Sequence, residues 1–180
     1  MAARDAPVIE PLGRHNDRSG FSCDVLALDD YLRERASQDR RWRVAQVFIA
    51  LGSSESEIAG CYTLNAAAFR REDLPPELAK RLPRYPLPAA VLGRLAVSSK
   101  NQGKGLGEHL LVDALHRVMG ASSTLAIYVV LVDAKNESAK AFYLRYSFQP
   151  FPKQPMRLFL SLRTLAEGGP PQDLRIQIKR

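Results

Sequence analysis

A glycine-rich loop between an apolar run and an amphipathic segment constrains this chain most. Residues 102–107 read Gln-Gly-Lys-Gly-Leu-Gly; they follow the apolar run Val91–Val97 and precede Glu108–Met119, whose apolar residues recur at helical spacing. Glycine lets the backbone approach a ligand closely, and the first N–H groups of a helix have no partners inside it. Because the helix dipole also attracts negative charge, a strand, a glycine turn and a helix in this order predict a phosphate or pyrophosphate site.

Two familiar phosphate-binding loops do not fit this segment. A Walker A loop closes with a Lys-Ser/Thr pair, which this loop lacks. The dinucleotide fingerprint Gly-x-Gly-x-x-Gly has a different spacing from Gly103, Gly105 and Gly107. The segment instead matches Gln/Arg-x-x-Gly-x-Gly/Ala, with Gln102, Gly105 and Gly107 in the key positions. A glycine-rich strand-to-helix turn without a ligand remains the alternative.

A second strand and helix follow this loop. Leu125–Val132 is rich in β-branched residues and predicts a buried strand. Asn136 is placed to cap a helix, because apolar residues then recur at helical spacing at Ala139, Phe142, Tyr143 and Tyr146.

The remaining elements are predicted from periodicity and from turn residues. We expect strands at Pro7–Leu12, Ala45–Leu51, Ile58–Phe69 and Met156–Leu162. We expect helices at Asp24–Ser37 and, with prolines at its entry, Pro75–Leu82.

Composition limits the classes of protein that the chain can belong to. It has 180 residues, of which 46% are apolar, which suits one globular domain. Cys23 and Cys61 lie in no metal-binding pattern, so we expect free buried thiols and no metal. The chain shows neither a signal peptide nor an apolar run of about 20 residues, so we expect a cytoplasmic protein without a membrane span. A net charge of +7 favours an anionic partner.

The glycine loop and the segment from Asn136 to Phe148 together resemble the two halves of GNAT-type acetyltransferases. One departure is Ser147, which takes the place of the usual glycine before Phe148. We expect it to change a turn, because glycine relieves a positive φ and serine does not.

The rest of the chain is similar to one GNAT subgroup, the acetyltransferase toxins of bacterial type II toxin–antitoxin modules. The likeness runs from about Pro11 to Leu162 and is carried by Phe21–Asp24, Ala27–Leu32, Ala36–Asp39, Gly60–Leu64, Leu82–Pro88 and Leu92–Val97. It implies an α/β GNAT fold, with a mixed central sheet of about six to seven strands flanked by about four helices. One acetyltransferase domain would span residues 1–165, and residues 166–180 would form a C-terminal tail in which only Leu174–Ile178 looks ordered.

The resemblance also implies which residues hold acetyl coenzyme A. The strand residues Leu95, Ala96 and Val97 would pair with the pantetheine arm and polarise the thioester carbonyl. The pyrophosphate would meet the backbone of the loop, which comprises Gln102, Gly103, Lys104, Gly105, Leu106 and Gly107. Asn136 would lie near the pantetheine or the thioester. Its other role, a plain helix cap, is compatible with this one.

Tyr143 is the candidate general acid, because it occupies the position whose hydroxyl points at the coenzyme sulfur in related enzymes. The alternative for Tyr143 is a core aromatic on an amphipathic helix. No general base is evident, and Asp133 is the nearest candidate. An α-amino group has a pKa of about 7.7–8.0, so a good fraction of it is neutral at physiological pH without a strong base.

The implied function is acetyl transfer to the α-amino group of aminoacyl-tRNA, which blocks translation. The candidates for tRNA contact are four arginines in two basic segments: Arg41, Arg43, Arg81 and Arg84. Trp42 is placed to stack on a base. The implied partners are a ribbon-helix-helix antitoxin and a second copy of the chain. The alternatives are a GNAT enzyme for a small-molecule amine or a protein N-terminus, and a binder that has no catalytic activity.

Overall fold

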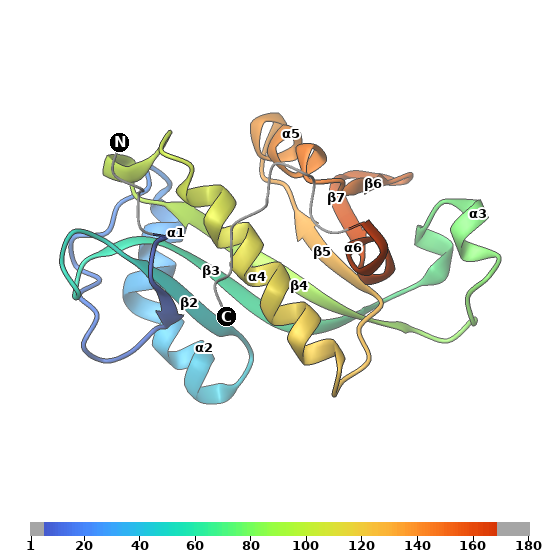
Figure 1. The fold of residues 1–180 in the computed structure, drawn as a ribbon, viewed down its shortest axis with the longest axis horizontal. Helices are drawn as coiled ribbons and strands as arrows, with labels where there is room; N and C mark the ends of the chain where they lie inside the picture. The colour runs from blue at the N-terminus through green and yellow to red at the C-terminus, as the bar shows by residue number, and fades with distance from the viewer. Residues whose placement is uncertain (1–5, 169–180) are drawn as a thin grey trace. The chain divides into compact units, whose positions relative to one another are not determined.

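The structure, a computed structural model, describes residues 6–168 of the chain (Figure 1). The strands are β1 (Ile9–Pro11), β2 (Gln46–Leu51), β3 (Ile58–Phe69), β4 (Leu87–Val97), β5 (Val129–Asp133), β6 (Gln149–Phe151) and β7 (Gln154–Ser161). The α-helices are α1 (Leu26–Asp30), α2 (Ala36–Trp42), α3 (Pro76–Ala79), α4 (Leu106–Ser122), α5 (Glu137–Arg145) and α6 (Leu162–Gly168). Three other helical turns are η1 (Tyr31–Arg35), η2 (Arg71–Asp73) and η3 (Ser99–Asn101).

The strands form one mixed sheet of seven strands in the order β1-β2-β3-β4-β5-β7-β6. β4 and β5 pair in parallel, whereas the pairs β1–β2, β2–β3, β5–β7 and β6–β7 are antiparallel. The expected α/β class with a mixed sheet of this size is confirmed.

The chain forms two compact units, each with its own apolar core. Of the described residues, unit 1 comprises 6–65 and Leu92–Leu115, and unit 2 comprises Ala66–Val91 and 116–168. β3, β4 and α4 therefore contribute residues to both units.

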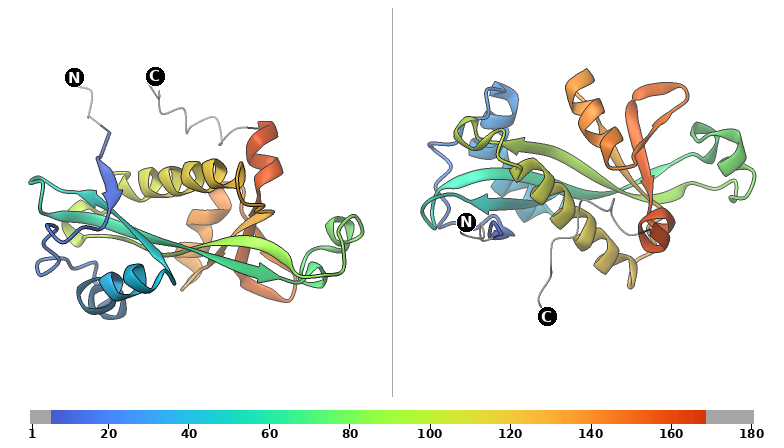
Figure 2. Two further views of the ribbon diagram at one scale, coloured as in Figure 1. Left: turned by 90° about the horizontal axis from the view of Figure 1, so that it is seen from below. Right: turned by 45° about the horizontal axis from the view of Figure 1, so that its top comes forward.

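In unit 1, a helical stretch runs without a break from α1 through η1 to α2, and η1 is a π-helical turn. Figure 2 shows this stretch and the first part of α4 on opposite faces of the sheet. The stretch turns Tyr31, Leu32 and Ala36 into the core of the unit, which also contains Leu12, Phe21, Val47, Ile49, Ile58 and Ala96. Apolar residues at helical spacing thus cover one face of β1, β2 and β3.

The first helix differs from the expected Asp24–Ser37 at both ends. It begins later because Asp24 has a φ of 64°, which a right-handed helix does not allow. It ends later, at Trp42, where Arg43 adopts a φ of 58° and its N–H binds the Arg40 carbonyl at 3.1 Å. A left-handed residue of this kind is a common way to end a helix.

In unit 2, β4 and β5 pair from Ala89–Val129 to Val91–Leu131. Every residue of β5 pairs with β7, from Val129–Ser161 to Asp133–Arg157, and α5 and α6 both contact β7. The core of this unit is rich in aromatic rings and contains Phe69, Leu74, Leu87, Ala89, Val129, Leu131, Phe151 and Phe159.

Unit 2 also shows where the expected boundaries need correction. β5 begins at Val129 rather than Leu125, because the Leu125 N–H binds the Ala121 carbonyl in the turn that ends α4. The three residues of β6 were not expected as a strand. Residues 166–168, expected to open the tail, are the last of α6, and Leu174–Ile178 lies outside the described residues.

Ser147 corrects the expectation for the turn after α5. It adopts a φ of 67°, the conformation for which glycine is usual. The N–H of Ser147 binds the Leu144 carbonyl at 3.2 Å, and the N–H of Phe148 binds the Tyr143 carbonyl at 3.3 Å. The serine therefore accepts the left-handed conformation, and the turn closes α5 in the way expected of a glycine.

Candidate active site

The loop from β4 to α4 has the backbone that its glycines predict. Gly103 and Gly105 have φ values of 71° and 83°, which residues with a Cβ rarely adopt. α4 begins at Leu106, and the N–H of His109 binds the Gly105 carbonyl at 3.3 Å. The N–H groups of Leu106, Gly107 and Glu108 thus precede the first hydrogen bond inside the helix and remain available to an anion.

The side chain of Gln102 holds this loop in place through two hydrogen bonds to backbone carbonyls of unit 1. Its Nε2 donates to the carbonyl oxygens of Val97, at 3.1 Å, and of Cys23, at 3.4 Å. Lys104 folds back, and its Nζ donates to the Lys100 carbonyl at 2.6 Å. Gln102 therefore joins the loop to the end of β4 and to the segment before α1, while the charge of Lys104 stays at the loop.

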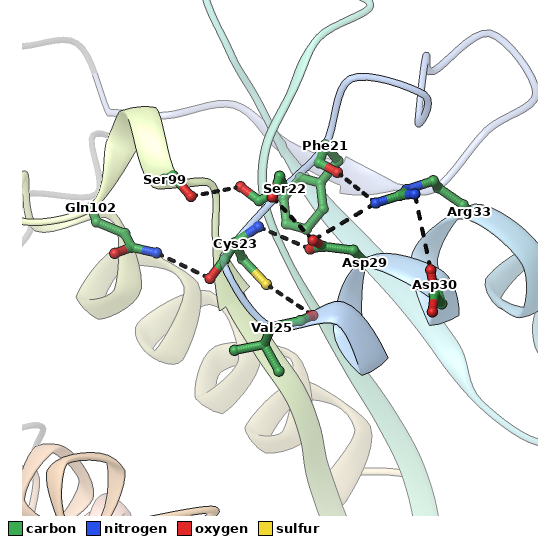
Figure 3. Close-up of polar contacts among 9 residues, drawn as sticks. All are labelled: Phe21, Ser22, Cys23, Val25, Asp29, Asp30, Arg33, Ser99 and Gln102. Carbon is green, nitrogen blue, oxygen red and sulfur yellow. Dashed lines mark hydrogen bonds and ion pairs between the residues drawn. The ribbon is translucent and has the colours of Figure 1, made fainter.

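A buried carboxylate holds the segment on which the loop rests (Figure 3). The Ser99 N–H donates to the Ser22 carbonyl at 2.8 Å. The Asp29 side chain, of which 2% is exposed, accepts from the Cys23 N–H at 2.9 Å and from Ser22 Oγ at 3.1 Å. Burial raises the pKa of Asp29, but these hydrogen bonds and the charge of Arg33, 3.7 Å away, outweigh burial and lower it.

Sequence reasoning did not find this role of Asp29. The residue belongs to the Ala27–Leu32 motif that carries part of the resemblance, which was the available signal. Only the fold brings Asp29, Ser22 and Ser99 together, as Figure 3 shows.

Arg94 marks an irregularity in β4 that the sequence did not reveal. Its φ of 48° is unusual within a strand. The Arg94 carbonyl accepts from the Cys61 thiol at 3.8 Å, and the guanidinium lies 3.9 Å from the centre of the Tyr31 ring. The Tyr31 hydroxyl in turn donates to Asp39 at 2.9 Å. Burial raises the pKa of Cys61 to about 12, so the thiol keeps the proton that it donates.

In unit 2, α5 carries the candidate acid. Asn136 caps this helix as expected, because its Oδ1 accepts from the Ala139 N–H at 2.8 Å. Tyr143 is 8% exposed, and its ring meets Phe142 and Phe148 edge to face at 5.2 and 5.4 Å. Within residues 6–168 the Tyr143 hydroxyl has no hydrogen-bond partner. Burial raises its pKa to about 12, so the phenol is protonated at neutral pH.

The structure provides little support for Asp133 as a base. Its side chain is 66% exposed and lies 3.6 Å from the Arg157 guanidinium in an ion pair. In the described part of the chain, no group of three or more His, Cys, Asp or Glu side chains is arranged to hold a metal ion.

The four candidate arginines are all exposed. Arg41 and Arg43 lie at the end of α2 in unit 1, and Arg81 and Arg84 follow α3 in unit 2. None of them forms an ion pair with another residue in the range 6–168, so their charges are free to meet an anionic partner. Trp42 is 60% exposed beside Arg41 and Arg43. As for membranes, no helix between residues 6 and 168 is both long and apolar enough to cross one.

Comparison with known proteins agrees with this geometry. The sequence profile of the acetyltransferase (GNAT) family matches residues 20–148. A tRNA-acetylating toxin of Mycobacterium tuberculosis (strain ATCC 25618 / H37Rv) is 34% identical over 148 residues, which cover 82% of this chain and 87% of the relative. A probable toxin TacT of Sinorhizobium fredii (strain NBRC 101917 / NGR234) is 30% identical over 168 residues, covering 88% and 92%.

Solved structures of toxins share the fold. AtaT complexed with acetyl-methionyl-tRNAfMet has a TM-score of 0.83 at 29% identity and covers 89% of this chain and 97% of its own. AtaTR bound with acetyl-CoA has a TM-score of 0.78 at 29% identity, covering 91% and 98%. A tyrosine-to-phenylalanine mutant of the AtaT toxin, bound to the C-terminus of the antitoxin AtaR, has a TM-score of 0.78 at 26% identity, covering 91% and 98%.

Proposed function

This chain belongs to the acetyltransferase (GNAT) family, and we propose that it transfers the acetyl group of acetyl-CoA to the α-amino group of aminoacyl-tRNA and thereby blocks translation. The observation that carries the choice of acceptor is the 34% identity to a tRNA-acetylating toxin over most of both chains. The complex of AtaT with acetyl-methionyl-tRNAfMet supports the same substrate class.

In this proposal the coenzyme is held mainly by backbone groups. The pyrophosphate binds the free N–H groups at the start of α4, where Gly103 and Gly105 leave room and Lys104 adds positive charge. The pantetheine arm pairs with Leu95–Val97, the end of β4, which continues past the residues paired with β5. Gln102 acts from within the loop, through its bonds to Val97 and Cys23. Asn136 combines its cap with a contact to the coenzyme.

The proposed reaction needs one proton donor on the protein. The α-amino nitrogen attacks the thioester carbonyl, so that a C–N bond forms and the C–S bond breaks. The amine proton leaves through water, since an α-amino group is already partly neutral near pH 7.7–8.0. Tyr143 donates its phenolic proton to the leaving thiolate and regains one from solvent. Its protonated state at neutral pH and its unpaired hydroxyl suit this role.

A GNAT enzyme for a small-molecule amine or a protein N-terminus is the alternative. It would share the loop and Tyr143, but it would have no use for exposed, unpaired arginines. Arg41, Arg43, Arg81 and Arg84 therefore favour the nucleic-acid acceptor. By analogy with AtaT bound to the C-terminus of AtaR, we also propose an antitoxin partner, of the ribbon-helix-helix type. A homodimer, a cytoplasmic location and a single catalytic domain over residues 1–165 complete the proposal.

The direct test is incubation with labelled acetyl-CoA and total charged tRNA. We expect the label on the amino acid after mild release from the tRNA, and we expect growth arrest when the protein is expressed in a bacterial host. Small amines and peptide N-termini, offered at equal concentration, serve as the competing acceptors. Labelling of these acceptors with none on charged tRNA, together with unaffected growth, would reject the tRNA acceptor.

Gly105→Ala tests the loop. The Cβ has open space, so the substitution acts through the φ of 83°, and a left-handed residue with a Cβ costs about 1–3 kcal/mol. We expect the affinity for acetyl-CoA, measured by titration calorimetry, to fall about tenfold or more, since 1.4 kcal/mol is one factor of ten.

Gly120→Ala is the matched control, because Gly120 lies in α4, also has open space for a Cβ and lacks a positive φ. It should leave coenzyme affinity unchanged and stabilise the helix by up to about 1 kcal/mol. Equal affinities for the two variants would mean that the positive φ at Gly105 does not shape the coenzyme site.

A further inference from the structure

A cavity of about 520 Å³ lies beside α2 in unit 1, apart from the glycine loop. Three arginines line it, together with shorter polar side chains and one acid: Arg14, Arg40, Arg41, Glu34, Ser37 and Gln38. Three guanidinium groups against one carboxylate leave the cavity with a net positive charge. It therefore favours an anion.

Arg40 provides the sharper observation. Its Nε is buried, and the described residues offer it no hydrogen-bond partner. Leaving a buried donor of a charged group without a partner is costly, and a bound acceptor would remove that cost. Within residues 6–168, no ion pair involves any of the three arginines, Arg14, Arg40 and Arg41. Arg18 donates to the Oγ of Ser37, one of the lining residues, at 2.5 Å.

We propose that this cavity binds a phosphodiester group of the RNA substrate, an inference that rests on the proposed function. Guanidinium groups bind phosphate oxygens with pairs of parallel hydrogen bonds, and three arginines line this one cavity. Trp42 adjoins Arg41 in the sequence and is 60% exposed. An exposed indole beside phosphate-binding groups suits a stacked base, which favours RNA over an acidic peptide.

Arg40→Gln tests the cavity, because it removes the charge and the Nε donor but keeps a polar side chain. We expect the KM for aminoacyl-tRNA to rise about fivefold to tenfold with kcat unchanged. Loss of one phosphate contact should also make the plot of log affinity for tRNA against log salt concentration shallower by about one. Arg41→Gln, at an exposed position, should make the same plot shallower. This second variant tests the proposal even if Arg40→Gln does not fold.

The matched control is Arg163→Gln, which removes the same charge from an exposed arginine that pairs with Glu167 at 2.7 Å in unit 2. It should leave KM and salt slope unchanged. Aminoacyl-adenosine, an acceptor without phosphate groups, should be acetylated equally by the wild type and by Arg40→Gln. If the wild type acetylates neither acceptor, the proposed function is wrong. The salt dependence of tRNA binding then still tests whether the cavity binds a phosphate group.

Three results would overturn the cavity proposal. One is a salt slope for Arg40→Gln equal to that of Arg163→Gln. Another is binding of inorganic phosphate that Arg40→Gln abolishes while tRNA affinity stays the same, which would indicate a site for free phosphate. The last is loss of binding to an acidic peptide with RNA binding intact, which would indicate a protein partner.

Discussion

Replacing Tyr143 by phenylalanine is expected to lower kcat for acetyl transfer by about 10²–10⁴-fold, the usual contribution of general acid catalysis. The ring would keep its edge-to-face contacts with Phe142 and Phe148, so the fold and the affinity for acetyl-CoA should change little. Initial rates with charged tRNA and calorimetric titration with acetyl-CoA measure the two effects separately. Expression of the variant should no longer arrest growth.

The pH profile adds a second test of Tyr143. Burial raises the pKa of this phenol from 10.0 to about 12. An acid acts while it holds its proton, so kcat of the wild type should show no loss of the acid up to about pH 10. An alkaline decline near pH 8–9 would have to come from another group and would weaken the assignment.

Tyr146→Phe is the matched control for Tyr143, because it removes a hydroxyl from another buried tyrosine, directly after α5. We expect kcat to stay within about threefold of the wild type, since the proposed reaction uses no group of Tyr146, whose ring packs on Phe142. Equal losses in both variants would show that either hydroxyl serves only the packing around the helix.

Replacing Asp29 by alanine should cost about 2–4 kcal/mol of unfolding free energy. The substitution leaves the buried Cys23 N–H without its acceptor, and it removes the charge-assisted hydrogen bond from Ser22 and the ion pair with Arg33. Urea denaturation followed by circular dichroism measures the loss. The affinity for acetyl-CoA should fall as well, because the glycine loop rests on the segment that Asp29 holds.

The contribution of Asp29 should depend on pH in one direction. Its pKa in the folded protein lies below the ordinary 3.8, so its stabilisation is fully present above that value. The stabilisation is lost as the pH falls through the lowered pKa. The difference in stability between the wild type and Asp29→Ala should thus be constant from about pH 5 to 8 and shrink below about pH 4.

Asp30→Ala is the matched control for Asp29→Ala. Asp30 is the next residue of α1, and its replacement by alanine makes the same change in charge and helix propensity. Asp30 is exposed and lies 3.9 Å from Arg33, an ion pair of small value. We expect a cost below about 1 kcal/mol with little dependence on pH. If the two variants are equally stable, the network around Asp29 does not anchor the segment.

The sequence predicted the parts of the site that local rules control. The glycine turn between a strand and a helix, the cap at Asn136 and the buried thiols of Cys23 and Cys61 follow from residue type and spacing, and the structure confirms them. Each of these features depends on residues close together in the chain.

The missed features depend on tertiary contacts. Asp29 accepts a hydrogen bond from Ser22, and the Ser22 carbonyl accepts one from Ser99, which lies 77 residues after Ser22 in the chain. No periodic pattern in the sequence encodes such a link. The strand irregularity at Arg94 and the cavity at Arg40 arise in the same way, from neighbours that only the fold supplies. The predicted ends of the first helix were wrong because Asp24 and Arg43 adopt positive φ values, which are unusual for residues other than glycine.

The contacts of Gln102 have a consequence for binding thermodynamics. Its side chain ties the loop to Val97 and Cys23 through contacts that need no ligand. Most of the entropy lost in ordering such a loop is then lost during folding, before any coenzyme arrives. Association should therefore carry a small entropic penalty for the loop, and the affinity should reflect mainly the contacts that the diphosphate itself makes.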